Sequence, residues 1–153
     1  LADSVRRYQA VHGEPDRLLL SFHGIPQDYV DAGDPYATQC YRTAALLVQA
    51  LDLPEDRWQL SFQSRLGPKQ WLQPYTDHTL KSLGEKGVKN IQVICPGFSV
   101  DCLETLEEVS MENRDIFLEA GGEQYGYLPC LNDDAAHSQL FSELVSQHTQ
   151  GWD

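Results

Sequence analysis

The sequence predicts an α/β fold in which about four parallel strands form one sheet and helices cover both of its faces. Short apolar stretches alternate with longer helical patterns along the chain, which is the order that right-handed βαβ crossovers produce. The first apolar run, "LLLSF", is continuous, as expected for a strand that is buried on both faces. The length of 153 residues suits one domain, and 41% hydrophobic residues suffice for a core.

Four predicted strands each precede a predicted helix. The strands cover residues 16–23, 57–65, 88–97 and 123–131, and the helices cover residues 34–54, 76–87, 100–122 and 134–148. Asp34 is the expected N-cap of the first helix, with Pro35 at its first position and Pro54 as its stop. Glycines mark the ends of the next two helices, at Gly87 and at the pair of residues 121–122.

The composition argues against several classes of function. The net charge is −12, from 23 acidic and 11 basic residues, and such a chain is not expected to bind nucleic acid. No apolar run approaches the roughly 18–20 residues of a membrane span, and the N-terminal residues lack the apolar core of a signal peptide. Because the only methionine is Met111, we interpret the chain as a part of a longer or processed protein.

The four cysteines are expected to be reduced thiols of a cytoplasmic protein. Cys40, Cys95, Cys102 and Cys130 are widely spaced and form no CxxC pair, so they indicate neither a zinc ribbon nor a disulfide framework. No GxGxxG follows the first predicted strand, which makes a nucleotide-binding domain a weak alternative.

Chemistry-bearing residues follow three of the predicted strands. The carboxyl ends of parallel strands meet at one edge of the sheet, where ligands bind in open α/β folds. We therefore expect one site from the residues that follow these strands: His23 after the first, Gln63, Ser64, Arg65 and Trp71 after the second, and Phe98 and Glu104 after the third. A structural role for His23 as a sheet-end histidine stays open at this point.

The predicted helix after the third strand carries an acidic face. Glu104, Glu108 and Glu112 are spaced four residues apart and share this face, while Leu103 and Leu106 are expected on the buried side. The alternative is a solvated face whose first acids, with Asp101 and Glu104 as a variant capping box, stabilise the helix start. Together with His23, Glu104 forms a histidine–carboxylate pair that suits a divalent first-row metal such as Fe(II).

Several longer motifs resemble one known family. The stretches "LLLSFHGIP", "DPY", "FQSRLGPKQWLQPYTD", "GVKNIQVICPGFSVDCLETLEE" and "YLPCLND" are similar, in order and spacing, to the C-terminal half of ferrochelatase, the protohaem ferro-lyase, in its proteobacterial form. The resemblance runs from about Leu18 to about Asn132. It implies a Rossmann-like, chelatase-like three-layer lobe, one of two lobes that flank a porphyrin cleft.

The resemblance also implies a reaction and roles for individual residues. The reaction inserts Fe(II) into protoporphyrin IX, as the last step of haem biosynthesis, and releases two protons. His23 and Glu104 fall on the catalytic and metal-binding positions, and Phe98 and Trp71 fall on positions that line the porphyrin pocket. The remaining expectations concern Arg65, which would contact substrate or the neighbouring lobe, and Glu108, which would continue an acidic path from the site.

The same resemblance sets expectations for domains, cofactors and partners. Residues 1–16 would end the helix between the lobes, and residues 17–153 would form the C-terminal lobe, with the N-terminal lobe missing and little activity in the isolated chain. No cofactor is expected beyond substrate Fe(II), and no [2Fe–2S] cluster, because the cysteine spacing differs from that of cluster-bearing members. Where many members have histidine this chain has Cys102. Peripheral membrane contact stays open because porphyrins are apolar.

Three alternatives remain at this stage. One is a chelatase for another tetrapyrrole, such as cobalt insertion into sirohydrochlorin, and another is iron insertion into coproporphyrin. The third is a non-catalytic α/β interaction module, for which His23 and Glu104 would be dispensable.

Overall fold

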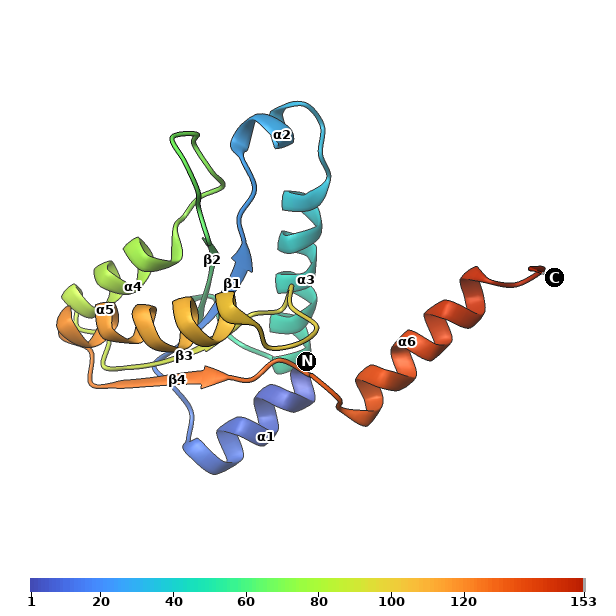
Figure 1. Cartoon of the computed structure of the whole chain (residues 1–153). Helices are drawn as coiled ribbons and strands as arrows, with labels where there is room; N and C mark the ends of the chain where they lie inside the picture. The colour runs from blue at the N-terminus through green and yellow to red at the C-terminus, as the bar shows by residue number, and fades with distance from the viewer. Residues whose placement is uncertain (153) are drawn as a thin grey trace.

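The structure, a computed structural model, describes residues 1–152 and contains one sheet of four strands that all run parallel. The strands lie in the order β2-β1-β3-β4 (Figure 1). Their bounds are β1 Arg17–His23, β2 Trp58–Gln63, β3 Asn90–Ile94 and β4 Gln124–Leu128. The predicted α/β class and the four parallel strands are confirmed.

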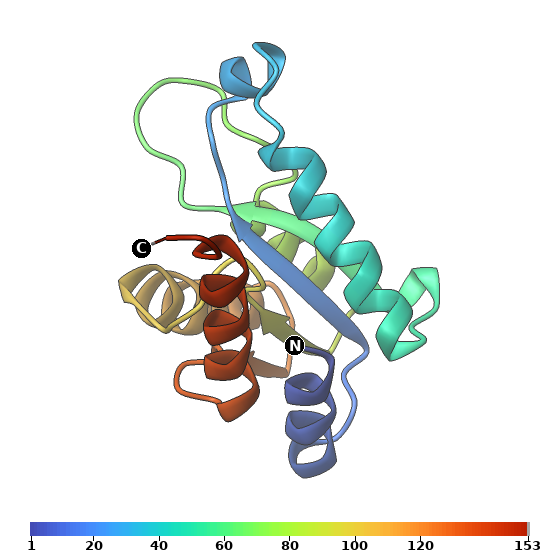
Figure 2. The same ribbon diagram turned by 90° about the vertical axis from the view of Figure 1, so that its right-hand side faces the viewer.

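Helices cover both faces of this sheet. One face carries α1 and α3, and the other carries α4, η2 and α5 (Figures 1 and 2). The helices are α1 Ala2–His12, α2 Gln27–Asp31, α3 Tyr36–Leu51, η1 Glu55–Arg57, α4 Thr76–Glu85, η2 Glu104–Glu112, α5 Asn113–Glu119 and α6 Ala135–His148. The predicted three-layer arrangement is therefore confirmed, with the sheet between the two groups of helices.

Strand β1 explains the two layers, because its side chains alternate between them. Leu18 and Leu20 belong to the core beneath α1 and α3, whereas Leu19 packs with Leu80 and Phe117 beneath α4 and α5. Every residue from 18 to 22 is at most 2% exposed, so the continuous apolar run is a strand buried on both faces.

The first helix of the chain is an integral part of this core. Val5 of α1 is 0% exposed and packs within the cluster that contains Leu18 and Leu20. The helical character expected for residues 1–16 is present in α1, and a connection from it to a preceding lobe stays a prediction. At the start of α3 the N-cap is Pro35 and not the predicted Asp34, but the Asp34 side chain, one residue earlier, accepts a 2.8 Å hydrogen bond from the Tyr36 backbone N–H.

The helix predicted for residues 100–122 differs from the structure. Residues 104–112 form a π-helix, η2, and only residues 113–119 continue as an α-helix. Its inward row is Thr105, Val109 and Asn113, and the expected buried side was wrong because Leu103 and Leu106 are 69% and 49% exposed. The prediction missed this inward row because it looked for apolar residues at helical spacing, and two residues of the row are polar.

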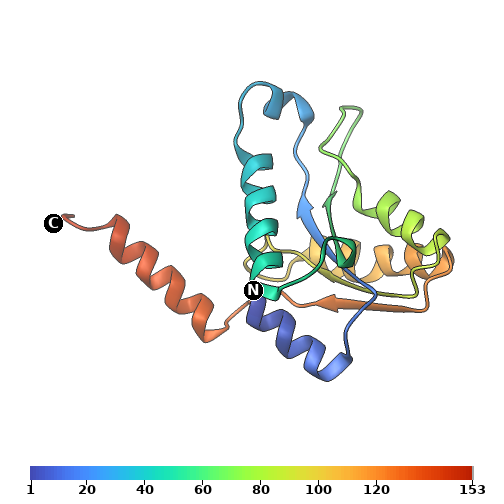
Figure 3. The ribbon, with the colours of Figure 1, turned by 180° about the vertical axis from the view of Figure 1, so that it is seen from behind.

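The last helix, α6, extends away from the sheet (Figures 1 and 3). Its N-cap Asp134 accepts a hydrogen bond from the Ala136 N–H, and His137 is its one buried residue. Leu140, Phe141, Leu144 and Val145, at neighbouring helical positions, are each at least 40% exposed.

The contact between α4 and α5 predicts a mutational effect. A Cβ on Gly84 would lie 2.8 Å from Ala120 Cβ and 3.0 Å from the Phe117 carbonyl oxygen. We expect Gly84→Ala to destabilise the fold by about 1–3 kcal/mol through overpacking, despite a helix-propensity gain of about 1 kcal/mol. Urea unfolding of the variant, beside the exposed control Lys81→Ala, measures this; an unchanged or higher midpoint for Gly84→Ala would contradict the close packing.

Candidate active site

The site lies where the order of the strands reverses. From β1 the chain adds β2 on one side and β3 then β4 on the other, and in open α/β sheets ligands bind at the carboxyl ends of the strands beside such a reversal, here β1 and β3. His23 is the last residue of β1, and its ring centroid lies 6.3 Å from that of Trp71 and 6.2 Å from that of Phe98. The structure thus brings together three residues from three separate predicted strand ends.

The backbone holds the half-buried His23 ring in one orientation. Its Nδ1 lies 2.6 Å from the Gly24 carbonyl oxygen, which can only accept a hydrogen bond, so Nδ1 carries a proton. The hydroxyl of Tyr36 donates a 2.8 Å hydrogen bond to the His23 carbonyl oxygen and fixes the main chain at the same point. In the neutral ring Nε2 is therefore left with its lone pair, as a base or metal ligand requires.

Close packing explains why a glycine, Gly24, follows this histidine. A Cβ on Gly24 would lie 3.1 Å from the Gln63 carbonyl oxygen and 3.3 Å from the Trp71 ring. The Gly24 N–H donates a 2.8 Å hydrogen bond to that same carbonyl. The absence of a side chain thus lets the chain after β1 pass close to both β2 and the indole.

Glu104 is the exposed first residue of η2. A hydrogen bond with the Cys102 side chain lowers its pKa most, its own backbone N–H adds to this, and the charge of His23 lowers it further. The carboxylate is therefore ionised at neutral pH and lies within the electrostatic reach of His23. The Gln63 side-chain amide donates a 3.1 Å hydrogen bond to the Glu104 carbonyl oxygen, which ties η2 to the end of β2.

Gln63 is the functional-site residue whose connecting role the sequence did not indicate. It is 3% exposed, and its Oε1 accepts hydrogen bonds from Ser21 Oγ at 2.7 Å and from Cys95 Sγ at 3.4 Å. The hydroxyl of Thr76 lies 2.8 Å from that of Ser21 and 2.9 Å from that of Ser61, which extends the network to α4. The feature of the sequence that could have indicated this role is the presence of polar residues, Ser21, Ser61 and Gln63, inside otherwise apolar buried strands.

Two segments beyond the sheet edge support Trp71. Its indole Nε1 donates a 3.0 Å hydrogen bond to the Leu66 carbonyl oxygen, and its backbone pairs with Pro26. Residues 25–27 and 70–72 are joined by further backbone hydrogen bonds of 3.0 and 2.9 Å, and Lys69 binds Asp28 at 2.7 Å. The two segments project together past the strands in Figures 1 and 3.

Arg65 and Glu108 are both engaged within the chain. The Arg65 guanidinium binds Asp77 through two hydrogen bonds of 2.8 and 2.7 Å and lies 4.3 Å from the centroid of the Tyr75 ring. The Glu108 carboxylate accepts a 2.7 Å hydrogen bond from the Ser64 N–H and a second one from the Ser64 hydroxyl. Both side chains thereby fix the turn after β2, where Ser64 has a φ of 61°.

A cavity of about 370 Å³ is bordered by this turn, the start of α4, η2 and α5. Arg65, Asp77, Glu108 and Glu112 line it, so two members of the predicted acidic face share one hollow, while Glu104 lies outside its lining. Within residues 1–152 no group of three or more His, Cys, Asp and Glu side chains is placed to hold a metal ion.

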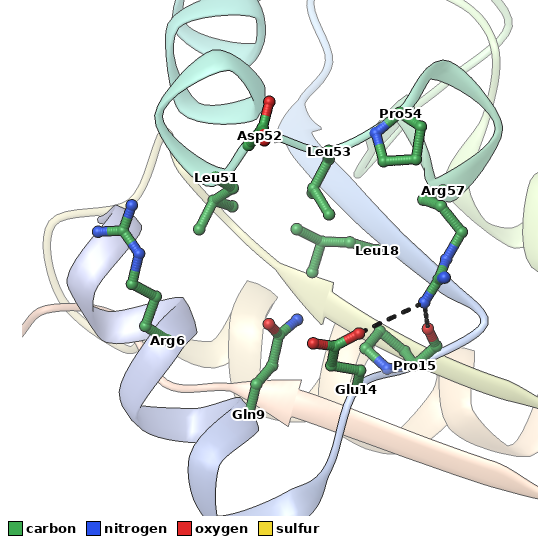
Figure 4. A pocket seen from close by; sticks show the side chains of 10 residues that line it. All are labelled: Arg6, Gln9, Glu14, Pro15, Leu18, Leu51, Asp52, Leu53, Pro54 and Arg57. Atoms are coloured by element: carbon green, nitrogen blue, oxygen red, sulfur yellow. Dashed lines mark hydrogen bonds and ion pairs between the residues drawn. The ribbon is translucent and has the colours of Figure 1, made fainter.

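A second cavity, of about 300 Å³, lies at the opposite edge of the sheet (Figure 4). Arg6, Glu14, Leu18 and Arg57 are among its lining residues, and none of the predicted site residues belongs to it. Arg57 donates a 2.7 Å hydrogen bond to the Pro15 carbonyl oxygen across this hollow. No described helix is long and apolar enough to cross a membrane.

The Arg65–Asp77 pair predicts a pH dependence of stability. Partial burial acts to raise the pKa of Asp77, but its hydrogen bonds with Arg65 and with the His78 backbone lower the pKa below the usual value. A carboxyl group with a depressed folded-state pKa stabilises the fold above its unfolded-state pKa of about 3.9, and this stabilisation disappears as the pH falls. We expect Asp77→Asn to lower the urea midpoint at pH 7 and to converge with the unmodified chain as the pH falls below the ordinary carboxyl pKa of about 3.9.

The control for this measurement is Asp133→Asn, which removes an exposed carboxylate elsewhere. A destabilisation by Asp77→Asn that stays constant from pH 7 to pH 3 would contradict a role of the ionised carboxylate.

The chain is similar to known proteins over nearly all of its length. The family model Ferrochelatase matches residues 1–149. The chain is 57% identical to the ferrochelatase of Psychrobacter sp. (strain PRwf-1) over 152 residues, which cover 99% of this chain and 45% of the relative. It is 59% identical to the ferrochelatase of Klebsiella pneumoniae (strain 342) over 148 residues, which cover 97% of this chain and 46% of the relative.

A solved structure shares the fold at low sequence similarity. The CbiX protein of Marinobacter aquaeolei VT8, named for cobalamin (vitamin B12) biosynthesis, aligns with a TM-score of 0.55 and 14% identity, covering 89% of this chain and 98% of that one. At this identity the likeness supports the fold alone.

The chain spans less than half the length of the curated relatives described above. The match of the family model nevertheless extends over nearly all of its residues, from α1 to the end of α6. The chain belongs to the ferrochelatase family.

Proposed function

We propose that the full-length protein inserts ferrous iron into protoporphyrin IX to form protohaem, and that this chain is its metal-binding C-terminal lobe. Family membership supports the reaction class. The relatives are about twice as long as the chain, which supports a second lobe as the opposite wall of the porphyrin cleft. On this proposal the isolated lobe has little activity because half of the cleft is missing.

The observation that carries the proposal is the placement of His23 between two aromatic rings. Its Nδ1 is committed to the Gly24 carbonyl, so Nε2 is the atom available to a substrate. Trp71 and Phe98 lie at similar ring distances from it, and their apolar faces suit a flat macrocycle. Metal insertion removes two pyrrole N–H protons, and a neutral imidazole can accept a proton or bind Fe(II) near neutral pH.

Glu104 supplies the second polar group of the proposed reaction. Its lowered pKa keeps the carboxylate ionised, so it can take up the other proton or bind the incoming iron ion. In this scheme Fe(II) is a substrate and needs only transient ligands. Glu108 and Glu112 would follow as the next acids along η2, beside the cavity that they line.

The other proposed roles concern Arg65, the partners and the location. Arg65 holds the turn that leads to Trp71 through its contacts with Asp77 and Tyr75, and its partly exposed head group is available to substrate or to the other lobe. We assign the protein to the cytoplasm, with peripheral membrane contact for the delivery of an apolar porphyrin. No resident cofactor and no [2Fe–2S] cluster is part of the proposal, and the acidic net charge of −12 supports the absence of nucleic-acid partners.

The first test replaces the histidine in the full-length protein. We expect His23→Ala to lower kcat for anaerobic insertion of Fe(II) into protoporphyrin by at least about 100-fold, because general acid–base groups contribute about 10²–10⁴-fold. Loss of the free-base porphyrin absorption bands measures the rate. His148→Ala, an exposed histidine on α6, is the matched control and should keep full activity.

Each other result has a defined meaning. Equal rates for His23→Ala and the unmodified protein would make His23 a structural sheet-end residue. If the unmodified protein leaves protoporphyrin unchanged, the same assay with coproporphyrin, and with cobalt and sirohydrochlorin, tests the other tetrapyrrole chelatases; failure of all of them would favour an interaction module.

The second test separates Glu104 from its acidic neighbours. Glu104→Gln keeps the size of the side chain but removes its charge, and we expect kcat to fall by at least about 10-fold with a folded protein. Glu107→Gln removes an exposed charge from the same helix and should stay within about 2-fold of the unmodified rate. Equal effects of the two substitutions would mean that the overall charge of η2 matters and not the position of Glu104.

A further inference from the structure

The motif "YLPCLND", residues 127–133, covers the end of β4 and the turn after it, and the proposed chemistry assigns it no role. In the structure three of its residues converge on one carboxylate, that of Asp101. Asp101 Oδ1 accepts hydrogen bonds from the Tyr127 hydroxyl at 2.6 Å and from the Cys130 backbone N–H at 3.2 Å. Its Oδ2 accepts a 2.7 Å hydrogen bond from Asn132 Nδ2.

The bond between Asp101 and Asn132 is reciprocal. The Asp101 backbone N–H donates a 2.8 Å hydrogen bond to Asn132 Oδ1, while Asn132 Nδ2 also donates to the Cys130 carbonyl oxygen at 3.1 Å. The Asn132 backbone N–H donates a 3.0 Å hydrogen bond to the Ser99 carbonyl oxygen. The carboxamide oxygen, the carboxamide nitrogen and the backbone N–H of Asn132 thus all form hydrogen bonds, either to residues 99–101 or to the Cys130 carbonyl.

The backbone conformation at position 132 restricts which residue can form these hydrogen bonds. Its φ of 48° lies in the left-handed region, where asparagine is enriched and β-branched residues are strongly disfavoured. An asparagine here combines the required backbone conformation with one acceptor and two donors.

The loop that these bonds hold carries site residues on both sides of its anchors. Phe98 immediately precedes the anchored Ser99, and Glu104 follows the anchored Asp101 by three residues. Thr105 adds a link, because its hydroxyl lies 3.3 Å from Asp101 Oδ1 and accepts a 2.9 Å hydrogen bond from the Cys102 N–H. We propose that Asn132 is a positioning residue, which, through Ser99 and Asp101, holds residues 98–104 and thereby fixes Phe98 against His23 and Glu104 at the start of η2.

We call the hydrogen bonds that join Asn132 to Ser99 and Asp101 the clamp. The clamp is a feature of the structure itself, and only its expected effect on catalysis rests on the proposed function. Hydrogen bonds to an ionised carboxylate are about twice as strong as those between neutral groups. Partial burial acts to raise the pKa of Asp101, but the hydrogen bonds from Asn132, Tyr127 and Cys130 lower it on balance, consistent with an ionised acceptor.

The experiment uses the full-length protein with two substitutions at one position. Asn132→Gly keeps the left-handed backbone and removes the carboxamide, whereas Asn132→Asp keeps the size but sets a second carboxylate against Asp101. The double variant Asp101→Asn/Asn132→Asp restores an amide opposite a carboxylate. Asp133→Ala, at the exposed neighbouring position, is the control.

Two readouts are measured for each variant: hydrogen exchange of the amides in residues 98–106, and kcat and KM for protoporphyrin. We expect both single variants to speed exchange in this segment by at least about 10-fold. Exchange in β2 should stay unchanged, and kcat should fall about 10-fold or more. The double variant should recover part of the loss seen with Asn132→Asp, and the control should match the unmodified protein.

Three outcomes would overturn the inference. Unchanged exchange in residues 98–106 would mean that the clamp does not hold the loop. Faster exchange with unchanged kcat and KM would make the clamp purely structural. An unmodified protein that fails to metallate any tetrapyrrole would remove the proposed function, and the catalytic part of this inference with it, whereas the exchange result would still report on the clamp.

Discussion

The buried side chain of Gln63 is the interaction on which the geometry of the site depends. It accepts hydrogen bonds from Ser21 of β1 and from Cys95 after β3, and it donates one to the Glu104 carbonyl oxygen of η2. Its backbone carbonyl receives the Gly24 N–H. One residue therefore sets the spacing between the histidine and the carboxylate, which come from segments about 80 residues apart in the sequence. An unpaired buried amide costs about 1–3 kcal/mol, so the arrangement is strongly favoured once all partners are in place.

Both faces of the sheet carry an apolar cluster, and the face beneath α4 also contains buried polar side chains. Beneath α1 and α3 the strands contribute leucine and phenylalanine side chains, which provide much of the apolar burial. Beneath the start of α4 the same strands contribute Ser21, Ser61 and Gln63, which are buried and hydrogen-bonded. Hydrogen bonds have preferred directions and apolar contacts do not, so these polar side chains fix the orientation of the strand ends that bear the site.

The sequence predicted those features that follow from local pattern and from the rules of parallel sheets. The strands and the meeting of His23, Trp71 and Phe98 at one edge are of this kind, because parallel strands must end together. Features that depend on distant partners could not be read from the chain. Gln63 was expected at this edge, but its hydrogen bonds to three other segments were not, and the inward row of η2 and α5 was misplaced because polar Thr105 and Asn113 occupy it.

The exposed apolar strip of α6 affects two properties of the 153-residue chain differently: its folding stability and its tendency to self-associate. This helix is only 14 residues long, near the limit at which an isolated helix is marginal in water, and its residues beyond His137 are not buried. It therefore adds little to the free energy of unfolding of the sheet. Its strip of leucine, phenylalanine and valine instead governs solubility, because contiguous exposed apolar surface promotes self-association. The isolated chain thus gains a tendency to self-associate from a segment on which its folding stability hardly depends.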